Sequence, residues 1–515
     1  MRLILWALAP LAGLALVAAC REPTEWTPSV PPSFSQAGIP TQCPSHADFV
    51  ATDQASLLAA TGAAQPGDTI AVNGTIDVTV TEIDLNTDGI TLTCATPGSG
   101  LRVGAGANVD YLVFVGAKDV SVEHLVLDAH GVNWGAYVAF NFTALGLPTP
   151  DAERERFVDN TVRCGTGIAA GCVEVDNEGA PGAVVTDNRI QSDEGITGLQ
   201  FQSVVDGRVE RNTVFATTPA FAPAIHIDGG AHNVVANNVV TGPWFSALGL
   251  DDGNRTTLVR ENRLEGATDA SIALFTAEDD TLIANVVQCG DFCLAADASP
   301  RLVIVDNQFT STGSTSGVHV QTGSDGTRIE RNTIVATAPS TFASFGGIRA
   351  RDGSSLAIVG NSVVGPWANA IAITDLSAST VQGNSVLGPA TFGVWLGAGT
   401  SFLPVAMKDN RVLANRVSGA GSAGIFARSA CRNRFIGNNL QGNGGDVGAV
   451  FDATTGANTF AGNGTIVVDN GNFDCDGDGT PDPNIITGAR AVLRGVPFAS
   501  PSTAPVATRH RIAMR

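Results

Sequence analysis

Short alternations of apolar and polar residues recur along most of this chain. In Ile225–Asp228 and Val318–Gln321, every second residue is apolar. A period of two predicts β-strands, and no stretch of ten residues with helical spacing interrupts these alternations. The pattern therefore predicts many short strands joined by turns.

A phrase centred on asparagine marks each unit of this pattern. It reads apolar, two variable residues, asparagine, one variable residue, apolar, as in Val209–Val214. Its asparagines are Asn160, Asn188, Asn212, Asn238, Asn262, Asn285, Asn307, Asn332, Asn361, Asn384, Asn410, Asn438 and Asn463. The intervals are 28, 24, 26, 24, 23, 22, 25, 29, 23, 26, 28 and 25 residues. A period that persists in this way predicts a solenoid.

Each unit has room for three short strands, so stacked units should form three parallel sheets. The predicted fold class is all-β, a right-handed parallel β-helix of about 14–15 coils, because parallel crossovers favour the right hand. We expect the asparagine at a sharp bend, in the left-handed conformation, where its side chain bonds to the asparagines of neighbouring coils. Its role is then structural and not catalytic.

The N-terminus predicts export. Residues 1–20 contain one arginine followed by an apolar run, which indicates a signal peptide. The run ends Leu-Val-Ala-Ala-Cys and resembles a bacterial lipobox. This resemblance implies cleavage before Cys20, lipidation of its sulfur and, because no aspartate follows, sorting to the outer membrane or cell surface. Residues 21–42, rich in Pro, Ser and Thr, are expected to be a flexible tether.

Eight further cysteines suggest disulfides, as an even number does in an exported chain. The expected pairs are Cys43–Cys94, Cys164–Cys172, Cys289–Cys293 and Cys431–Cys475. The last pair lies about two coils apart, so it requires the end of the chain to fold back. Spacing alone does not fix the connectivity.

Residues 43–80 differ from the repeats and are expected to cap the solenoid, whose core would otherwise be exposed. Within them, Asp53–Ala60 predicts one or two turns of helix. The string SLLAA…AQPGDTIAVNGTI is similar to the entry cap of the pectate-lyase-like superfamily of right-handed parallel β-helix proteins. This resemblance implies a β-helix over residues 81–470. The superfamily includes polysaccharide lyases, polygalacturonases, tail spikes and adhesins, so the fold does not fix the function.

In such proteins ligands usually lie along one sheet, on outward side chains of successive coils. Aligning the strand that opens each unit predicts a row of outward residues: Glu174, Gln200, His226, Gly249, Ala273, Ala295, His319, Arg349, Ala372, Trp395 and Phe426. The row at the strand ends is Asp176, Gln202, Asp228, Asp251, Thr276, Asp297, Gln321, Arg351, Thr374, Gly397 and Arg428. The predicted face is polar first, then small or apolar, then partly basic.

His226, Asp228, Asp251 and Asp252 are the candidate catalytic residues. The first two lie on one predicted coil and the others on the next, so we expect them about 5 Å apart. Carboxylates at that distance can divide acid and base roles between them. Their Ile-Asp-Gly and Asp-Asp-Gly strings resemble the three-aspartate centre of polygalacturonases, although the Gly-His-Gly and Arg-x-Lys of that family are missing. Alternatively, these aspartates cap turns.

Three tryptophans are candidate ligand-binding residues, because aromatic rings offer large amphipathic surfaces. Trp244 and Trp367 each follow Gly-Pro at the same place in their coils, and Trp395 projects from a predicted strand. Trp244 and Trp367 either face a glycan or fold over a turn and fill a corner of the core, and the sequence leaves both alternatives open.

Residues 471–483 carry the sharpest local motif. Positions 1, 3, 5, 7 and 9 of a calcium loop are filled by Asp474, Asp476, Asp478, Thr480 and Asp482. Position 12 is Ile485 and not glutamate, so the motif resembles the Asp-rich calcium repeats of thrombospondin type 3 and bacterial surface proteins. It predicts structural Ca²⁺; the alternative is a solvated acidic turn. The tail, residues 484–515, carries no repeat phrase.

The formal net charge of −20 repels nucleic acid and anionic lipid, and also a polyuronate that calcium does not bridge. A neutral polysaccharide or a protein is electrostatically easier to bind. The sequence therefore predicts a surface lipoprotein whose β-helix binds polysaccharide or another surface partner. The alternative is a polysaccharide hydrolase or lyase that uses the acidic residues above. Catalysis, the ligand and the oligomeric state stay open.

Overall fold

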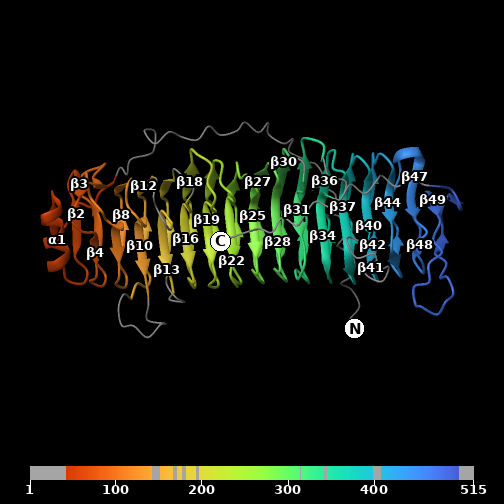
Figure 1. Cartoon of the computed structure of the whole chain (residues 1–515), viewed down its shortest axis with the longest axis horizontal. Helices are drawn as coiled ribbons and strands as arrows, with labels where there is room; N and C mark the ends of the chain where they lie inside the picture. Colours follow the sequence, from red (N-terminus) through yellow and green to blue (C-terminus); the bar gives the residue numbers. More distant parts are fainter. Residues whose placement is uncertain are drawn as a thin grey trace, which may run out of the picture.

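The computed structural model describes residues 42–141, 151–165, 171–176, 181–192, 196–313, 315–340, 345–397 and 407–497. These residues form an elongated rod of stacked strands, with α1 at one end and β49 near the other (Figure 1). The predictions of a signal peptide, a lipidated Cys20 and a tether up to residue 41 lie outside the described residues. Among the residues that are described, no helix combines the length and apolar character needed to cross a bilayer.

Successive strands alternate among three sheets, which we name A, B and C. Sheet A contains β1 (Phe49–Ala51), β2 (Thr69–Val72), β5 (Thr91–Cys94), β8 (Ser121–Glu123), β11 (Arg156–Val158), β14 (Val184–Thr186), β17 (Arg208–Glu210), β20 (Val234–Ala236), β23 (Leu258–Arg260), β26 (Thr281–Ile283), β29 (Val303–Val305), β32 (Arg328–Glu330), β35 (Ala357–Val359), β38 (Thr380–Gln382), β42 (Arg411–Leu413), β46 (Arg434–Ile436), β48 (Thr459–Ala461) and β50 (Ile485–Thr487). Sheet B contains β3 (Thr75–Val78), β6 (Gly100–Val103), β9 (Val126–Ala129), β12 (Thr161–Cys164), β15 (Arg189–Ser192), β18 (Thr213–Ala216), β21 (Val239–Thr241), β24 (Arg263–Leu264), β27 (Val286–Cys289), β30 (Gln308–Ser311), β33 (Thr333–Ala336), β36 (Ser362–Val364), β39 (Ser385–Leu387) and β43 (Arg416–Ser418).

Sheet C carries the face on which ligands were expected. Its strands are β4 (Ile83–Leu85), β7 (Tyr111–Val115), β10 (Gly135–Phe140), β13 (Val173–Asp176), β16 (Leu199–Gln202), β19 (Ile225–Asp228), β22 (Leu248–Asp251), β25 (Ala270–Phe275), β28 (Phe292–Asp297), β31 (Val318–Val320), β34 (Gly346–Ser354), β37 (Asn369–Ser377), β40 (Phe392–Gly397), β41 (Met407–Lys408), β44 (Ala423–Ala427), β45 (Ala430–Cys431), β47 (Val447–Phe451), β49 (Ile466–Asp469) and β51 (Ala491–Leu493).

The predicted three-sheet parallel β-helix is confirmed. Neighbouring strands pair in parallel, as β19 does with β22, where Ile225 lies opposite Leu248. Sheet A has 18 strands; without β1, which belongs to the cap, 17 coils remain, more than the 14–15 expected. The difference arises because the first coils, from β2 to β10, lack the asparagine phrase.

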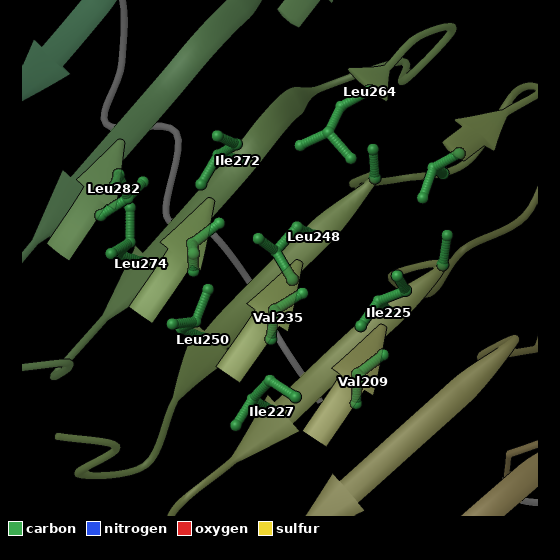
Figure 2. Packing of buried hydrophobic residues seen from close by; sticks show 14 of the residues in the cluster. Val209, Ile225, Ile227, Val235, Leu248, Leu250, Leu264, Ile272, Leu274 and Leu282 are labelled. Carbon is green, nitrogen blue, oxygen red and sulfur yellow. The ribbon is translucent and has the colours of Figure 1, made fainter. Parts of the chain in front are cut away.

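Inward-facing apolar residues of the three sheets form one core along the rod (Figure 2). Ile225 and Ile227 on β19 and Leu248 and Leu250 on β22 are all 0% exposed. Burying each such side chain contributes roughly 1.5–3 kcal/mol. The residues between them, at alternate positions, point out of the core, as a period of two requires.

A continuous ladder of buried asparagines lines the corner between sheets A and B. At Asn212, the backbone N–H and Nδ2 both donate to Oδ1 of Asn238, at 2.9 and 3.1 Å, and Nδ2 also donates to the carbonyl of Val185. The Nδ2–Oδ1 bonds connect Asn160, Asn188, Asn212, Asn238, Asn262, Asn285, Asn307, Asn332, Asn361, Asn384, Asn415, Asn438 and Asn463. The predicted coil-to-coil stacking is confirmed.

Two details of that prediction were wrong. The left-handed residue is the one before each asparagine, for example Arg211 with φ 56°, because this bend turns the following asparagine into the core. The ladder also passes from Asn384 to Asn415, an interval of 31 residues, and not to Asn410. That coil is longer than the others, so the regular spacing led to the wrong corner. Asn410 begins a second ladder between sheets C and A, which continues through Asn433, Asn458 and Asn484.

Helix α1 (Gln54–Ala63) lies at the N-terminal end of the rod, where a cap helix was predicted (Figure 1). Asp53 begins it with a capping box, in which its side chain accepts a hydrogen bond from the backbone of Ser56. Leu57 and Ala60 of α1 are buried against the first coils. The short 3₁₀-helix η3 (Gly444–Asp446) precedes β47.

The four expected disulfides are all present: Cys43–Cys94, Cys164–Cys172, Cys289–Cys293 and Cys431–Cys475. The last one forms because the chain folds back after β49. Phe473 and Asp482 form an antiparallel β-bridge, and Gly456 forms a parallel β-bridge with Cys431. This brings the Cα atoms of Cys431 and Cys475 to 5.8 Å.

Candidate functional site

The strand register tests the two predicted rows on the outward face of sheet C. The first row is confirmed along its length: His226, for example, lies opposite Gln200 on one side and Gly249 on the other. In the second row Asp228 lies opposite Asp251, as expected. Thr276 was placed wrongly, since Phe275 lies opposite Asp297 and Thr276 already belongs to the turn.

The four candidate catalytic residues lie together on this face; we call them the acid cluster (His226, Asp228, Asp251 and Asp252). Nε2 of His226 hydrogen-bonds Oδ1 of Asp251 at 2.7 Å, from one coil to the next. Gly249 leaves space for this contact, because a Cβ there would lie 3.3 Å from Cδ2 of His226. For His226 and Asp251 the geometry is therefore a specific pairing across two coils.

The charges within the acid cluster are coupled. Burial raises the pKa of Asp228 to about 6. The charge of His226 opposes this rise, and the charges of Asp251 and Asp252 and a hydrogen bond with Asp252 add to it. Burial alone would lower the pKa of His226, but its hydrogen bond to Asp251 and the three carboxylates raise it overall. Near pH 6 the imidazole of His226 is therefore protonated, and the carboxyl group of Asp228 is protonated in part of the molecules. The cluster can donate as well as accept hydrogen bonds, or serve as an acid and a base.

Two exposed aromatic residues near this face escaped the sequence prediction. Trp134, just before β10, is 40% exposed, and its Nε1 donates to Oε2 of Glu174 at 2.8 Å. Burial raises the pKa of Glu174 although this bond opposes the rise. Phe221, 86% exposed, lies in the loop that enters β19. A large apolar residue between two prolines in a predicted loop was the available signal.

The prediction that Trp244 and Trp367 bind ligand was wrong. They are 0% and 1% exposed, and each indole N–H donates to a carbonyl three residues earlier, of Thr241 and Val364. They fill a corner of the core, which was the alternative. Trp395 lies half-buried on the outward face of sheet C, against an apolar cluster that includes Phe426. Its role in binding stays a prediction.

The predicted calcium loop brings some of its residues together. Carboxylate oxygens of Asp474, Asp476 and Asp482 lie within 4.8 Å of one another. Asp478 stands outside this group, and its Oδ1 accepts the backbone N–H of Thr480. Backbone N–H groups, chiefly that of Gly479, lower the pKa of Asp474 and keep it ionised. Oxygen ligands suit Ca²⁺, but calcium binding here stays a prediction.

Two family models match the chain. Residues 158–341 match the model described as periplasmic copper-binding protein (NosD), and residues 315–473 match the model described as right handed beta helix region. No curated protein matches. The strand pairing, the asparagine ladder and these models together define the chain as a right-handed parallel β-helix repeat protein.

Solved structures with a similar fold include enzymes and surface proteins. The Dettilon tailspike protein shares 13% identity, over 72% of this chain and 64% of its own, with a TM-score of 0.40. The A-module of a mannuronan C-5 epimerase of Azotobacter vinelandii shares 14%, over 76% and 96%, with a TM-score of 0.35. The surface adhesin PfbA of Streptococcus pneumoniae shares 10%, over 74% and 87%, with a TM-score of 0.38.

Copper does not fit the described residues of the matched range. Its three histidines are separate: His226 bonds Asp251, His232 lies 3.6 Å from Asp206, and His319 packs beside phenylalanine rings. Its four cysteines are in disulfides. Copper favours clustered imidazole and sulfur ligands, and within the described part of this range no three metal-binding side chains converge.

Proposed function

We propose that this chain is a lipid-anchored extracytoplasmic protein that binds a polysaccharide along the outward face of sheet C. The observation that carries the proposal is the convergence of the acid cluster on two successive coils. His226 is half-buried and Asp251 is buried, and each holds the other by a hydrogen bond, so both are already oriented before a ligand arrives.

The chemistry of this face suits sugar hydroxyl groups. Carboxylates accept hydrogen bonds, the protonated groups of His226 and Asp228 donate them, and bonds to charged groups are the stronger ones. The exposed rings of Phe221 and Trp134 offer apolar surface to a sugar ring. The coils repeat about every 4.8 Å, so an extended ligand can contact several of them.

The proposed location agrees with the disulfides, which persist in oxidising compartments, and with the periplasmic description of the matched NosD family. We include the lipid anchor on Cys20 and the outer membrane in the proposal. Fractionation of wild type and Cys20→Ser tests it. Wild type should sediment with outer membranes and the variant should be released, whereas equal release of both would contradict the anchor.

Binding to a panel of neutral and acidic polysaccharides, measured by affinity electrophoresis, tests the main proposal. His226→Ala and Asp251→Asn should weaken the retardation that wild type shows. Asp279→Asn is the matched control, because Asp279 pairs with Arg301 away from the acid cluster and should leave binding unchanged. A wild type that binds no polysaccharide would reject this proposal in favour of a surface protein as partner.

A second function, polysaccharide hydrolysis or elimination, is favoured by one observation. Asp228, with a pKa of about 6, stands beside the exposed carboxyl group of Asp252, so two carboxyl groups in different environments lie side by side there. New reducing ends or unsaturated products, formed by wild type and lost in Asp228→Asn, would establish an enzyme. Binding without either product would reject it.

We also propose that Asp474, Asp476, Asp478, Thr480 and Asp482 bind structural Ca²⁺. The support is the convergence of three carboxylates in a loop that Cys475 ties to Cys431. Calcium should raise the melting temperature of wild type, EDTA should reverse this, and Asp476→Asn should abolish the response. Equal melting temperatures of wild type with calcium and with EDTA would contradict a structural ion.

A further inference from the structure

A second cluster of polar side chains lies farther along the same face of sheet C; we call it the basic cluster (His319, Arg349, Arg351 and Thr374). His319 on β31 lies opposite Arg349 on β34, and Arg351 lies opposite Thr374 on β37. The register thus places all four on three adjacent strands. Neither the acid cluster nor the calcium loop uses them.

Three of these side chains are buried and incompletely hydrogen-bonded. His319, Arg349 and Thr374 are 7%, 8% and 2% exposed. Nε2 of His319, Nε of Arg349 and Oγ1 of Thr374 have no hydrogen-bond partner among the described residues. Leaving a polar group buried and unpaired costs about 1–3 kcal/mol, and more for a charged one. Such a cost is reasonable where a ligand supplies the missing acceptor.

The residues around Arg349 orient its guanidinium group without neutralising its charge. The guanidinium carbon of Arg349 lies 4.3 Å from the ring centroid of Phe345, a cation–π contact. Arg351 is paired with Asp352 at 2.6 Å, so Asp352 is already engaged. Burial, helped by the two arginines, lowers the pKa of His319 well below its ordinary value, so its imidazole is neutral. Arg349 therefore supplies a positive charge that forms no ion pair with a carboxylate of the described residues, although the charge of Asp352 acts on it.

The basic cluster also has apolar walls, formed by buried phenylalanine rings. The rings of Phe292 and Phe345 lie 5.2 and 6.0 Å from the imidazole of His319. Between the two clusters the outward row consists of the small, buried residues Ala273 and Ala295. His226 and His319 are four strand spacings apart, about 19 Å.

We infer that the basic cluster is a binding site for an oxyanion, namely a carboxylate or sulfate group on an acidic residue of the bound saccharide. Arg349 is the cationic ligand, and Arg351 and Thr374 lie beside it. The inference rests on the proposed function for the saccharide, and it names the class. The distance of about 19 Å exceeds two Debye lengths at physiological salt, so the acid cluster does not cancel this attraction. A glycan with isolated acidic residues fits both clusters better than a polyuronate.

Isothermal titration with sodium glucuronate, glucose and sodium sulfate tests the inference. Wild type should bind glucuronate but not glucose, and Arg349→Gln should weaken glucuronate binding by at least about tenfold. Arg331→Gln is the matched control, because Arg331 pairs with Asp306 outside sheet C and should not affect the titration. Tighter binding of sulfate than of glucuronate would support an oxyanion site but would overturn the inference that its ligand is an acidic saccharide residue.

A thermal melt separates binding from a structural role. Arg349→Gln removes an unpaired buried charge, so its melting temperature should equal or exceed that of wild type. A lower melting temperature with unchanged glucuronate affinity would overturn the inference, as would a wild type that binds neither anion. These probes are monomeric. If they bind while no polysaccharide does, the inference stands and the proposed function fails. If a polysaccharide binds while neither anion does, the proposed function stands and the inference fails.

Discussion

The corner between sheets A and B and the outward face of sheet C are built on the same coils but differ in kind. At the corner, the same bond between asparagines of neighbouring coils recurs 12 times in succession and links 13 asparagines. On the outward face, Gln200, His226, Gly249 and Ala273 follow one another without repetition. The corner is internally satisfied, whereas the face retains polar atoms without partners.

The difference has an energetic origin. A ladder asparagine is buried and shares its bonds with two neighbouring coils, so replacing it disturbs three coils at once. An outward side chain of sheet C contacts mainly its neighbours on the face, and its replacement leaves the core intact. The repeated asparagines therefore stabilise the fold, whereas the outward residues of sheet C can vary without loss of stability and are available for binding. Substitutions in the two regions should separate stability from binding.

The largest loss of stability is expected from Trp244→Ala. This side chain is fully buried at a corner of the core, and truncation of a buried tryptophan costs about 3–5 kcal/mol. Urea unfolding followed by circular dichroism should show a clearly lower midpoint, while polysaccharide binding at low temperature persists. A variant that keeps the midpoint but loses binding would return Trp244 to the ligand-binding role that its burial argues against.

Asn262→Ala should cause the next largest loss of stability, about 3 kcal/mol, because several buried groups lose their hydrogen bonds to Asn262. These are Asn238, whose N–H and Nδ2 donate to it, Val235 and Asn285. Asn439→Ala is the matched control, since Asn439 is exposed outside the ladder. Equal urea midpoints for the two variants would show that the ladder does not stabilise the fold.

Asp280→Asn should change the pH dependence of stability. Burial raises the pKa of Asp280 to about 7, and the carboxyl group accepts bonds from Thr257 N–H and Asn254 Nδ2. A raised pKa stabilises the fold while the group is protonated, and this contribution disappears as the pH rises through about 7. The shift of about three pKa units is worth about 4 kcal/mol at pH 8, which the lost bond to Asn254 reduces to about 2. The variant should therefore melt higher than wild type at pH 8 but not at pH 5.

The exposed neighbour Asp279 supplies the control for this pH effect. The hydrogen bond from Arg301 lowers the pKa of Asp279, although the charge of Asp279 contributes to the raised pKa of Asp280. Asp279→Asn should therefore stabilise much less at pH 8 than Asp280→Asn does. An equal rise of the melting temperature at pH 8 in Asp279→Asn and Asp280→Asn would assign the effect to net charge and not to the buried carboxyl group.

The smallest effect on stability is expected from Asp252→Asn in the acid cluster. Asp252 is exposed and left-handed, with φ 48°, a conformation that asparagine tolerates, so the free energy of unfolding should change by less than about 0.5 kcal/mol. The pKa of Asp228 should fall, because Asp252 contributes to its elevation. NMR titration of the Asp228 carboxyl group measures this directly, and an unchanged pKa would contradict the coupling within the cluster.

The repeat made most of the fold and the first outward row predictable, because parallel strands in register convert an interval of about 25 residues into a contact between coils. It failed where coil length changes, as at Asn410, since the spacing alone does not distinguish two asparagine-bearing corners. The burial of Trp244 depends on how one turn folds, which a periodic pattern does not contain. Phe221 was missed because its loop interrupts the pattern that guided the search.

The affinity of His226→Ala for the polysaccharide that wild type binds best tests the central claim most directly, that the outward face of sheet C binds ligand while the asparagine corner holds the fold. We predict at least about tenfold weaker binding with a melting temperature within about 2 °C of wild type. Undiminished affinity, or a loss of affinity that follows a loss of folding, would contradict it.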